Sequence, residues 1–237
     1  MKTKKILAAI LCLNAFSAVA ETTDEMELAA SVWGAWMRGS VNVDGQQAKV
    51  ERSAINYIDM DYGYSLELAL RNSKLVLLGY LDYFDPISSD VSVGLKEGTL
   101  DSSELNGGIA IGFPMGSGNS TLDFLIGLQM LRMDNDLDLK GGSSYSESAN
   151  VYDAVLMMRY KQELFSNLYL NIPLLIGGTY LSDSEFVYDA GVQLLYQLGT
   201  TLDIRAGYRI SGYDFDEDED ATDFYQQGYT LGIGLTF

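Results

Sequence analysis

The stretch that decides the fold is Tyr229-Thr230-Leu231-Gly232-Ile233-Gly234-Leu235-Thr236-Phe237. Successive side chains of a β-strand point to opposite faces, so the strict alternation of this stretch divides it into two different surfaces. One face carries the aromatic and aliphatic side chains of Tyr229, Leu231, Ile233, Leu235 and Phe237, and the other carries only glycine and threonine. The pattern therefore predicts a strand with a single apolar face.

The first twenty residues have the pattern of a secretory signal. A basic start precedes an apolar run and a small-residue cleavage site: Lys2, Lys4 and Lys5, then residues 6–16, then Ala18-Val19-Ala20. The apolar run is too short to span a bilayer. We therefore predict a signal peptide over residues 1–20, with cleavage before Glu21, and a single domain over residues 21–237. The chain's one cysteine, Cys12, leaves with the signal, so the mature protein forms no disulfide.

Composition and charge narrow the class of protein. Apolar residues make up 47% of the chain, yet no run of 18 apolar residues follows residue 20. An exported protein of this kind is either a soluble periplasmic β protein or a membrane barrel, since only helices and closed barrels satisfy every backbone group in lipid. Beyond the signal, 12 basic residues face 33 acidic ones, a formal net charge of −21. Such a chain repels nucleic acid, so we expect no nucleic-acid partner.

Short alternating runs separated by turn residues recur along the whole chain. Ten strands are predicted, at residues 28–43, 62–71, 75–84, 105–113, 122–138, 151–161, 168–181, 186–198, 202–213 and 224–237. An even number is what bacterial single-chain barrels require. The predicted fold is all-β, an antiparallel up-and-down transmembrane β-barrel of ten strands. Because the first run is irregular, eight strands remain an alternative.

The predicted connections alternate in length. Those near residues 72–74, 115–120, 162–167 and 198–201 are short, and those near 44–61, 86–103, 139–150 and 214–223 are longer. Short periplasmic turns and longer external loops are typical of outer-membrane barrels, so both termini are expected on the periplasmic side.

Two residues do not fit the barrel pattern easily. Pro173 fits inside a closed barrel strand only at a bulge, and Arg132 falls on the lipid-facing side of its run. We expect a monomer.

The non-apolar faces of the runs distinguish a membrane barrel from a soluble, lipocalin-like barrel with an apolar interior. These faces mix charges with glycines, which favours a crowded small lumen, and tyrosines at the run ends favour interfacial girdles. The predicted inward charges are Glu67, Arg71, Asp123, Asp153, Arg159, Lys161, Asp203, Arg205 and Arg209. Buried charges are tolerated when they are paired, so one interpretation is a salt-bridged plug. The other is a narrow charged conduit.

The segments Tyr188–Tyr196 and Leu202–Arg209, an acidic loop and the final Gly-Leu-Thr-Phe resemble the C-terminal half of small OmpA-type outer-membrane β-barrels. The resemblance implies an outer-membrane location in a Gram-negative cell and contact with outer-membrane lipid and lipopolysaccharide. It also implies that the barrel-insertion machinery reads Tyr229, Leu231, Ile233, Leu235 and Phe237 as a terminal signal. It identifies a barrel class well and a function poorly.

The chain has no histidine, which removes Ser-His and Cys-His catalysis and histidine-ligated metals. The known outer-membrane proteases and phospholipases resemble His-dependent barrels, and this chain departs from them. No catalytic residue is predicted and no cofactor is expected. The acidic loop at Asp216, Glu217, Asp218, Glu219 and Asp220 is either a solvated loop or an external site for Ca²⁺ or Mg²⁺. Asp134, Asp136 and Asp138 form a second acidic cluster.

These observations predict a non-enzymatic outer-membrane β-barrel that acts as a structural protein or as a narrow, largely plugged channel. The alternative is a surface recognition or adhesion protein whose acidic loops bind cations, lipopolysaccharide or a host ligand.

Overall fold

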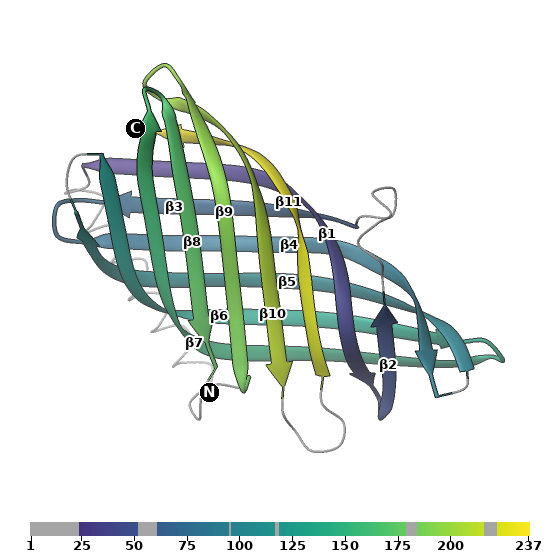
Figure 1. Ribbon diagram of the computed structural model, residues 1–237. Helices are drawn as coiled ribbons and strands as arrows, with labels where there is room; N and C mark the ends of the chain where they lie inside the picture. The colour runs from purple at the N-terminus through teal and green to yellow at the C-terminus, as the bar shows by residue number, and fades with distance from the viewer. Residues whose placement is uncertain (1–23, 52–60, 95, 117–118, 179–183, 216–221) are drawn as a thin grey trace.

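The computed structural model describes residues 24–51, 61–94, 96–116, 119–178, 184–215 and 222–237 (Figure 1). These residues form eleven antiparallel β-strands in one continuous sheet, and they contain no helix. Accordingly, the described part of the chain has no helix of the length and apolarity needed to cross a membrane. The strands are β1 (Glu25–Val43), β2 (Gln46–Glu51), β3 (Asp61–Arg71), β4 (Val76–Val93), β5 (Lys96–Met115), β6 (Ser120–Leu139), β7 (Ser143–Phe165), β8 (Leu168–Gly177), β9 (Phe186–Leu198), β10 (Leu202–Phe215) and β11 (Thr222–Thr236).

Ten of the strands form a closed ring. Neighbours in sequence pair from β3 through to β11, and β1 pairs with both β3 and β11. At the seam, the Met26 and Phe237 backbones exchange two hydrogen bonds of 3.0 and 2.9 Å. The predicted ten-stranded up-and-down barrel is confirmed, and the eight-stranded alternative is wrong. Closure satisfies the backbone groups of both terminal strands, as a lipid environment requires.

Two of the four predicted long loops are strands instead. β4 and β5 pair as far as Val93 and Lys96, and β6 and β7 pair as far as Leu139 and Ser143. The predicted loops at 86–103 and 139–150 are therefore the ends of two long hairpins, which extend beyond the ends of β8 and β9 in Figure 1. The two loop predictions were wrong because the outer faces of these hairpins lie in water. Serines and acids on those faces obscure the alternation of apolar and polar residues that identifies a strand.

The remaining strand, β2, is not one of the ring's ten strands but lies in the same sheet between β1 and β4, where β1 extends beyond its pairing with β3. β2 turns back from β1 at Asp44 and Gly45 and bridges toward β4 through the pairs Lys49↔Ser92 and Val50↔Val91. The structure thus adds a strand within the predicted connection at 44–61. The turns are short at one end of the ring, which the sequence predicts to face the periplasm and which we therefore call the periplasmic end; the opposite end is called extracellular. Asn72 Oδ1 caps one of the short turns by accepting hydrogen bonds from the Lys74 and Leu75 N–H groups.

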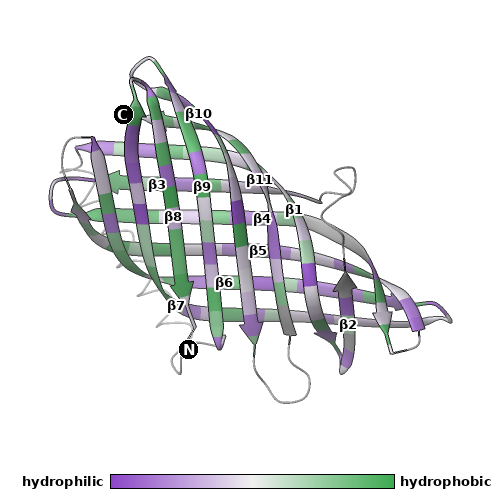
Figure 2. Cartoon of the chain, viewed as in Figure 1, coloured by the Kyte–Doolittle hydropathy of each residue, from purple (hydrophilic) through white to green (hydrophobic). Residues whose placement is uncertain are grey.

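The outer wall of the ring is apolar. Figure 2 shows hydrophobic and hydrophilic residues alternating along the strands, as a wall with lipid outside and a polar lumen inside requires. Large exposed side chains on this wall include Leu66, Ile109, Ile126, Leu128, Leu156, Ile204, Leu231 and Ile233. From the terminal strand, Tyr229, Leu231, Ile233 and Phe237 are exposed and Leu235 is half-buried. All five lie on the lipid-facing side of β11.

Pro173 is accommodated without a register shift. Pairing between β8 and β9 lapses at Ile172 and Pro173 and resumes at Leu174↔Ala190 in the same register. Gly191 stands across from the proline, and a Cβ atom there would lie only 3.2 Å from Pro173 Cγ, so the glycine leaves room for the ring. Arg132 lies on the outer face, where its Nε donates to Asp134 at 3.0 Å.

Candidate functional site

The predicted inward charges gather inside the ring, where they line two small cavities. A central cavity of about 110 Å³ is bordered by Glu67, Arg159, Arg205 and Arg209. A second cavity of about 160 Å³, toward the periplasmic end, is bordered by Arg71, Asp123, Arg159 and Lys161. Asp203 is buried beside Arg205. Asp153 is also buried but lies apart from these groups, six residues from Arg159 on β7, where it accepts hydrogen bonds from the Ser184 N–H at 3.1 Å and the Ser184 hydroxyl at 3.0 Å. Arg159 borders both cavities and so stands between them.

At the periplasmic end each cation has a partner on another strand. Arg71 Nη2, near the end of β3, donates to Asp123 Oδ2 on β6. Lys161 on β7 lies over the ring of Tyr169, with its Nζ 5.5 Å from the ring centroid. Arg71 is thus bound by a carboxylate, and Lys161 is bound by an aromatic ring.

Glu27 is the centre of the next layer, and sequence reasoning missed it. Its two carboxylate oxygens accept from Arg205 Nη2 at 2.6 Å and from Arg159 Nη2 at 3.4 Å. A second acid supports each arginine: Glu67 lies 3.1 Å from Arg159, and Asp203 lies 2.6 Å from Arg205. The side chain of each arginine is only 7% exposed. The cluster links β1, β3, β7 and β10 across the lumen.

Arg209 forms the third layer, again with acids that the sequence analysis did not single out. Its Nη2 donates to Asp82 Oδ2 at 2.6 Å and to Asp189 Oδ2 at 2.5 Å. Its guanidinium also lies 4.5 Å from the ring centroid of Trp33. Asp82 and Asp189 occupy inward positions of the predicted runs at 75–84 and 186–198, so the alternation contained the signal that would have found them.

A layer of polar groups, with Glu104 as its one carboxyl group, adjoins the Arg209 layer. Gln226 Nε2 donates to Glu104 at 2.7 Å, Asn106 Nδ2 donates to the Tyr213 hydroxyl at 2.8 Å, and the Tyr80 hydroxyl donates to Gln129 at 2.7 Å. Except for the partly buried Tyr80, these groups are buried. The layer connects the charged clusters below to an apolar region above.

Apolar side chains fill the extracellular half of the barrel interior. Trp33 packs edge-on against Phe84, with ring centroids 4.9 Å apart, and Tyr213 stacks on Phe224 at 5.3 Å. Beyond them the long hairpins and the β1–β2 hairpin enclose one hydrophobic core, with Val41, Val43, Val91, Leu100, Leu131, Met133, Leu137, Leu139 and Val151 among its members. Close packing of this kind excludes water from between the side chains that form the core. The interior thus has charged, polar and apolar layers in series.

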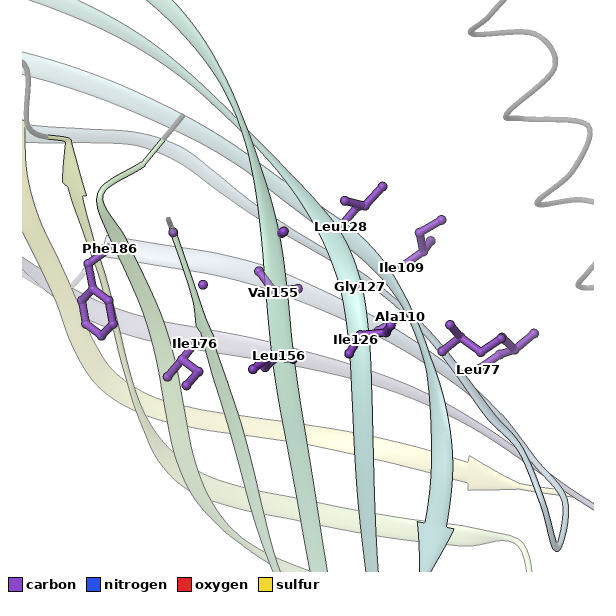
Figure 3. A pocket seen from close by; sticks show the side chains of 14 residues that line it. Leu77, Ile109, Ala110, Ile126, Gly127, Leu128, Val155, Leu156, Ile176 and Phe186 are labelled. Carbon is purple, nitrogen blue, oxygen red and sulfur yellow. The ribbon is translucent and has the colours of Figure 1, made fainter. Parts of the chain in front are cut away.

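The outer wall carries an apolar groove of about 760 Å³ across β4 to β9 (Figure 3). Ile109, Ile126, Leu128, Leu156 and Ile176 line it. Its lining is almost entirely apolar and belongs to the lipid-facing wall, so the groove is a surface that membrane lipid contacts.

The outer face of the β6–β7 hairpin carries a ladder of serines and aspartates. Each hydroxyl donates to the carboxylate directly opposite: Ser144 to Asp138 at 2.5 Å, Ser146 to Asp136 at 2.6 Å and Ser148 to Asp134 at 2.6 Å. Hydrogen bonds from Arg132 and Ser148 lower the pKa of Asp134 below its ordinary value. The residues that the structure describes contain no group of three or more acids placed to hold a metal ion. The candidate cation loop, Asp216–Asp220, lies outside them.

No protein-family model matches this sequence, and no curated protein sequence matches it. Solved structures share its architecture, among them the following two. The outer-membrane protease OmpT from Escherichia coli is 9% identical, with a TM-score of 0.61 and coverage of 91% of this chain and 98% of OmpT. The translocator domain of the autotransporter NalP from Neisseria meningitidis is 12% identical, with a TM-score of 0.50 and coverage of 98% and 96%. The chain therefore has the fold of a Gram-negative outer-membrane β-barrel, and its apolar outer wall belongs in that membrane.

Proposed function

We propose that the protein is a non-enzymatic outer-membrane barrel with a closed lumen, and that it serves to hold a rigid extracellular β-sheet at the cell surface for recognition. The observation that carries this proposal is the apolar core in the extracellular half of the barrel. That core closes the interior, and the strands that build it continue outward as the β4–β5 and β6–β7 hairpins. The proposed function combines two hypotheses from the sequence, a plugged barrel and a surface recognition protein.

The layering of the interior supports a plug over a conduit. A conduit needs a continuous polar path, but Phe84, Leu100, Leu131 and Phe224 are each no more than 1% exposed in the extracellular half. Below them, the ion pairs of Glu27 and Arg209 cross the lumen and leave cavities of only about 110 and 160 Å³. Charges paired in this way fix the relative positions of the strands and do not line an open channel.

The absence of histidine from the whole chain supports a non-enzymatic role. OmpT is a protease by name, but at 9% identity its likeness concerns the fold alone. Several lumen carboxylates are held by arginines and so belong to structural pairs: those of the buried Glu27, Asp82 and Asp203 and of the partly buried Asp189.

Single-channel recording tests this function. The full chain would be refolded into planar bilayers, with folding checked by heat-dependent gel mobility, beside a variant carrying Arg205→Gln and Arg209→Gln. Both proteins should be silent, because the apolar core above these arginines closes the lumen. Discrete openings of the folded wild type, altered in conductance by the two substitutions, would contradict the proposal and favour a charged conduit.

A cation site at Asp216–Asp220 is a separate proposal. If these acids hold Ca²⁺ together, millimolar Ca²⁺ should raise the melting temperature of the wild type but not that of a variant with Asp216, Asp218 and Asp220 changed to asparagine. An equal response of the two proteins would mean that the loop is only solvated.

A further inference from the structure

The outward half of β7 has a strand beside it on one edge only. β6 pairs with β7 along its whole length, from Leu139↔Ser143 to Ser120↔Gln162. On the other edge, the pairing with β8 begins at Val155↔Gly177 and continues only toward the periplasm. Within the described part of the chain, no strand pairs with that edge from Ser143 to Val151. At about 3.4 Å per residue this is an open edge of about 30 Å.

Most of the usual protections of an exposed edge are absent from this segment. Native sheets protect their edges with lysine, proline, bulges or inward-pointing charges. Residues 143–151 read Ser-Ser-Tyr-Ser-Glu-Ser-Ala-Asn-Val, with neither lysine nor proline. The β6–β7 ladder keeps one register throughout, so no bulge bends the edge. Glu147, the single charge, is on the inner face with Tyr145 and Val151, where it accepts a hydrogen bond from the Asp44 N–H at 2.7 Å and is thereby held by the β1–β2 turn.

The two faces beside the edge specify the chemistry of a strand that would join it. The outer face presents the carboxylates of Asp134, Asp136 and Asp138, held in place by serine hydroxyls. On the inner face, Val151 belongs to the apolar core and Tyr145 packs against that core. A matching strand therefore carries basic side chains on one face and apolar side chains on the other.

We propose that the β7 edge from Ser143 to Val151 binds an extended segment of a partner protein in which basic and apolar residues alternate, added to the sheet as a further strand. Main-chain hydrogen bonds would supply affinity, and the alternating side chains would supply selectivity. A second copy of β7 does not fit this site, since the segment has no basic residue and two copies would bring acidic faces together. The inference rests on the proposed recognition function and names the class of its partner.

A peptide of ten residues in which lysine and valine alternate is a suitable probe. The full chain in lipid nanodiscs would be mixed with this peptide, and hydrogen–deuterium exchange would be followed across β7. Strand addition predicts that exchange of backbone amides within residues 143–151 slows by about tenfold or more. Amides of β9 and β10 serve as the internal control and should not change.

Two N-methylated peptides separate strand addition from charge attraction. One is methylated on every valine and the other on every lysine, so each lacks the N–H donors along a different edge. Exactly one of them should lose binding if a backbone ladder forms, because only one edge of the peptide faces β7. The variant with Asp134, Asp136 and Asp138 changed to asparagine should bind the unmodified peptide at least about tenfold more weakly, yet show the same protected amides at saturation.

Unchanged exchange at residues 143–151, or equal binding by both methylated peptides, would overturn the proposed strand addition. Those results would not affect the single-channel recording, which tests the closed lumen. The proposed strand addition and the proposed closed lumen can therefore fail separately.

Discussion

Replacing Arg209 by methionine tests whether the lumen is sealed from water. Arg209 is the cation shared by Asp82 and Asp189, which accept from one Nη2 atom at 2.6 and 2.5 Å. Their side chains are only 5% and 16% exposed. The substitution keeps much of the side-chain volume over Trp33 but leaves the buried carboxylate of Asp82 and the partly buried carboxylate of Asp189 without their shared cation.

Removing one partner of a buried ion pair typically costs about 3–5 kcal/mol, whereas an exposed pair contributes only about 0–1 kcal/mol. Because Arg209 serves two acids in a sealed interior, we expect Arg209→Met to lower the free energy of unfolding by about 3–5 kcal/mol. Urea unfolding of the barrel in lipid vesicles, followed by tryptophan fluorescence and by gel mobility, measures the loss.

A matched variant separates charge from packing. Adding Asp82→Asn and Asp189→Asn to Arg209→Met removes the uncompensated charges, so most of the lost stability should return. A loss below about 1 kcal/mol for Arg209→Met would refute the reasoning, because it would mean that water reaches these groups and screens them. Failure of the triple variant to recover would assign the loss to packing instead.

Further changes test the other layers. Gly234→Ala should cost about 1–3 kcal/mol in the same urea assay, because its Cβ atom would clash with the Arg205 guanidinium and the Asp203 carboxylate. Leu131→Ala, in the apolar core, should cost about 2–5 kcal/mol, and a neutral result would mean that the core is loose. The pKa of Asp134 is lowered in the folded state, so its stabilisation is present above the ordinary carboxyl pKa and lost as the pH falls through the folded value. Thermal melts should therefore show Asp134→Asn below wild type at pH 7, with the gap closing below about pH 4; a gap independent of pH would contradict this.

The ring itself could be predicted from the sequence because lipid enforces a simple rule on each strand. Runs such as Leu202–Arg209 alternate between apolar and charged or small residues, and the structure places their two sets on opposite sides of the wall. The terminal strand pairs with β1 from Thr236↔Glu27 outward, which closes the ring that its pattern required. The alternation of apolar and polar residues, with a period of two, is enough to predict this part of the fold.

The partners within the lumen could not be predicted in the same way. Alternation indicates that Arg205 and Arg209 point inward, but the acid that each meets depends on the stagger of strands far apart in sequence. Glu27 meets Arg205 across 178 residues, and Asp82 meets Arg209 across 127. The long hairpins were missed for another reason, since their outer faces lie in water and their strands read as polar loops.

Thiol labelling tests the central claim, that an apolar core closes the extracellular half of the barrel. The only cysteine of the chain, Cys12, lies in the expected signal peptide, so an introduced cysteine is the single reactive site of the mature protein. Met133→Cys places a thiol in the core, and Asn150→Cys places one on the exposed face of β7 as the matched control. A membrane-impermeant maleimide added outside cells should modify the control rapidly and leave the folded core variant unmodified. Equal labelling of the two would contradict a closed lumen.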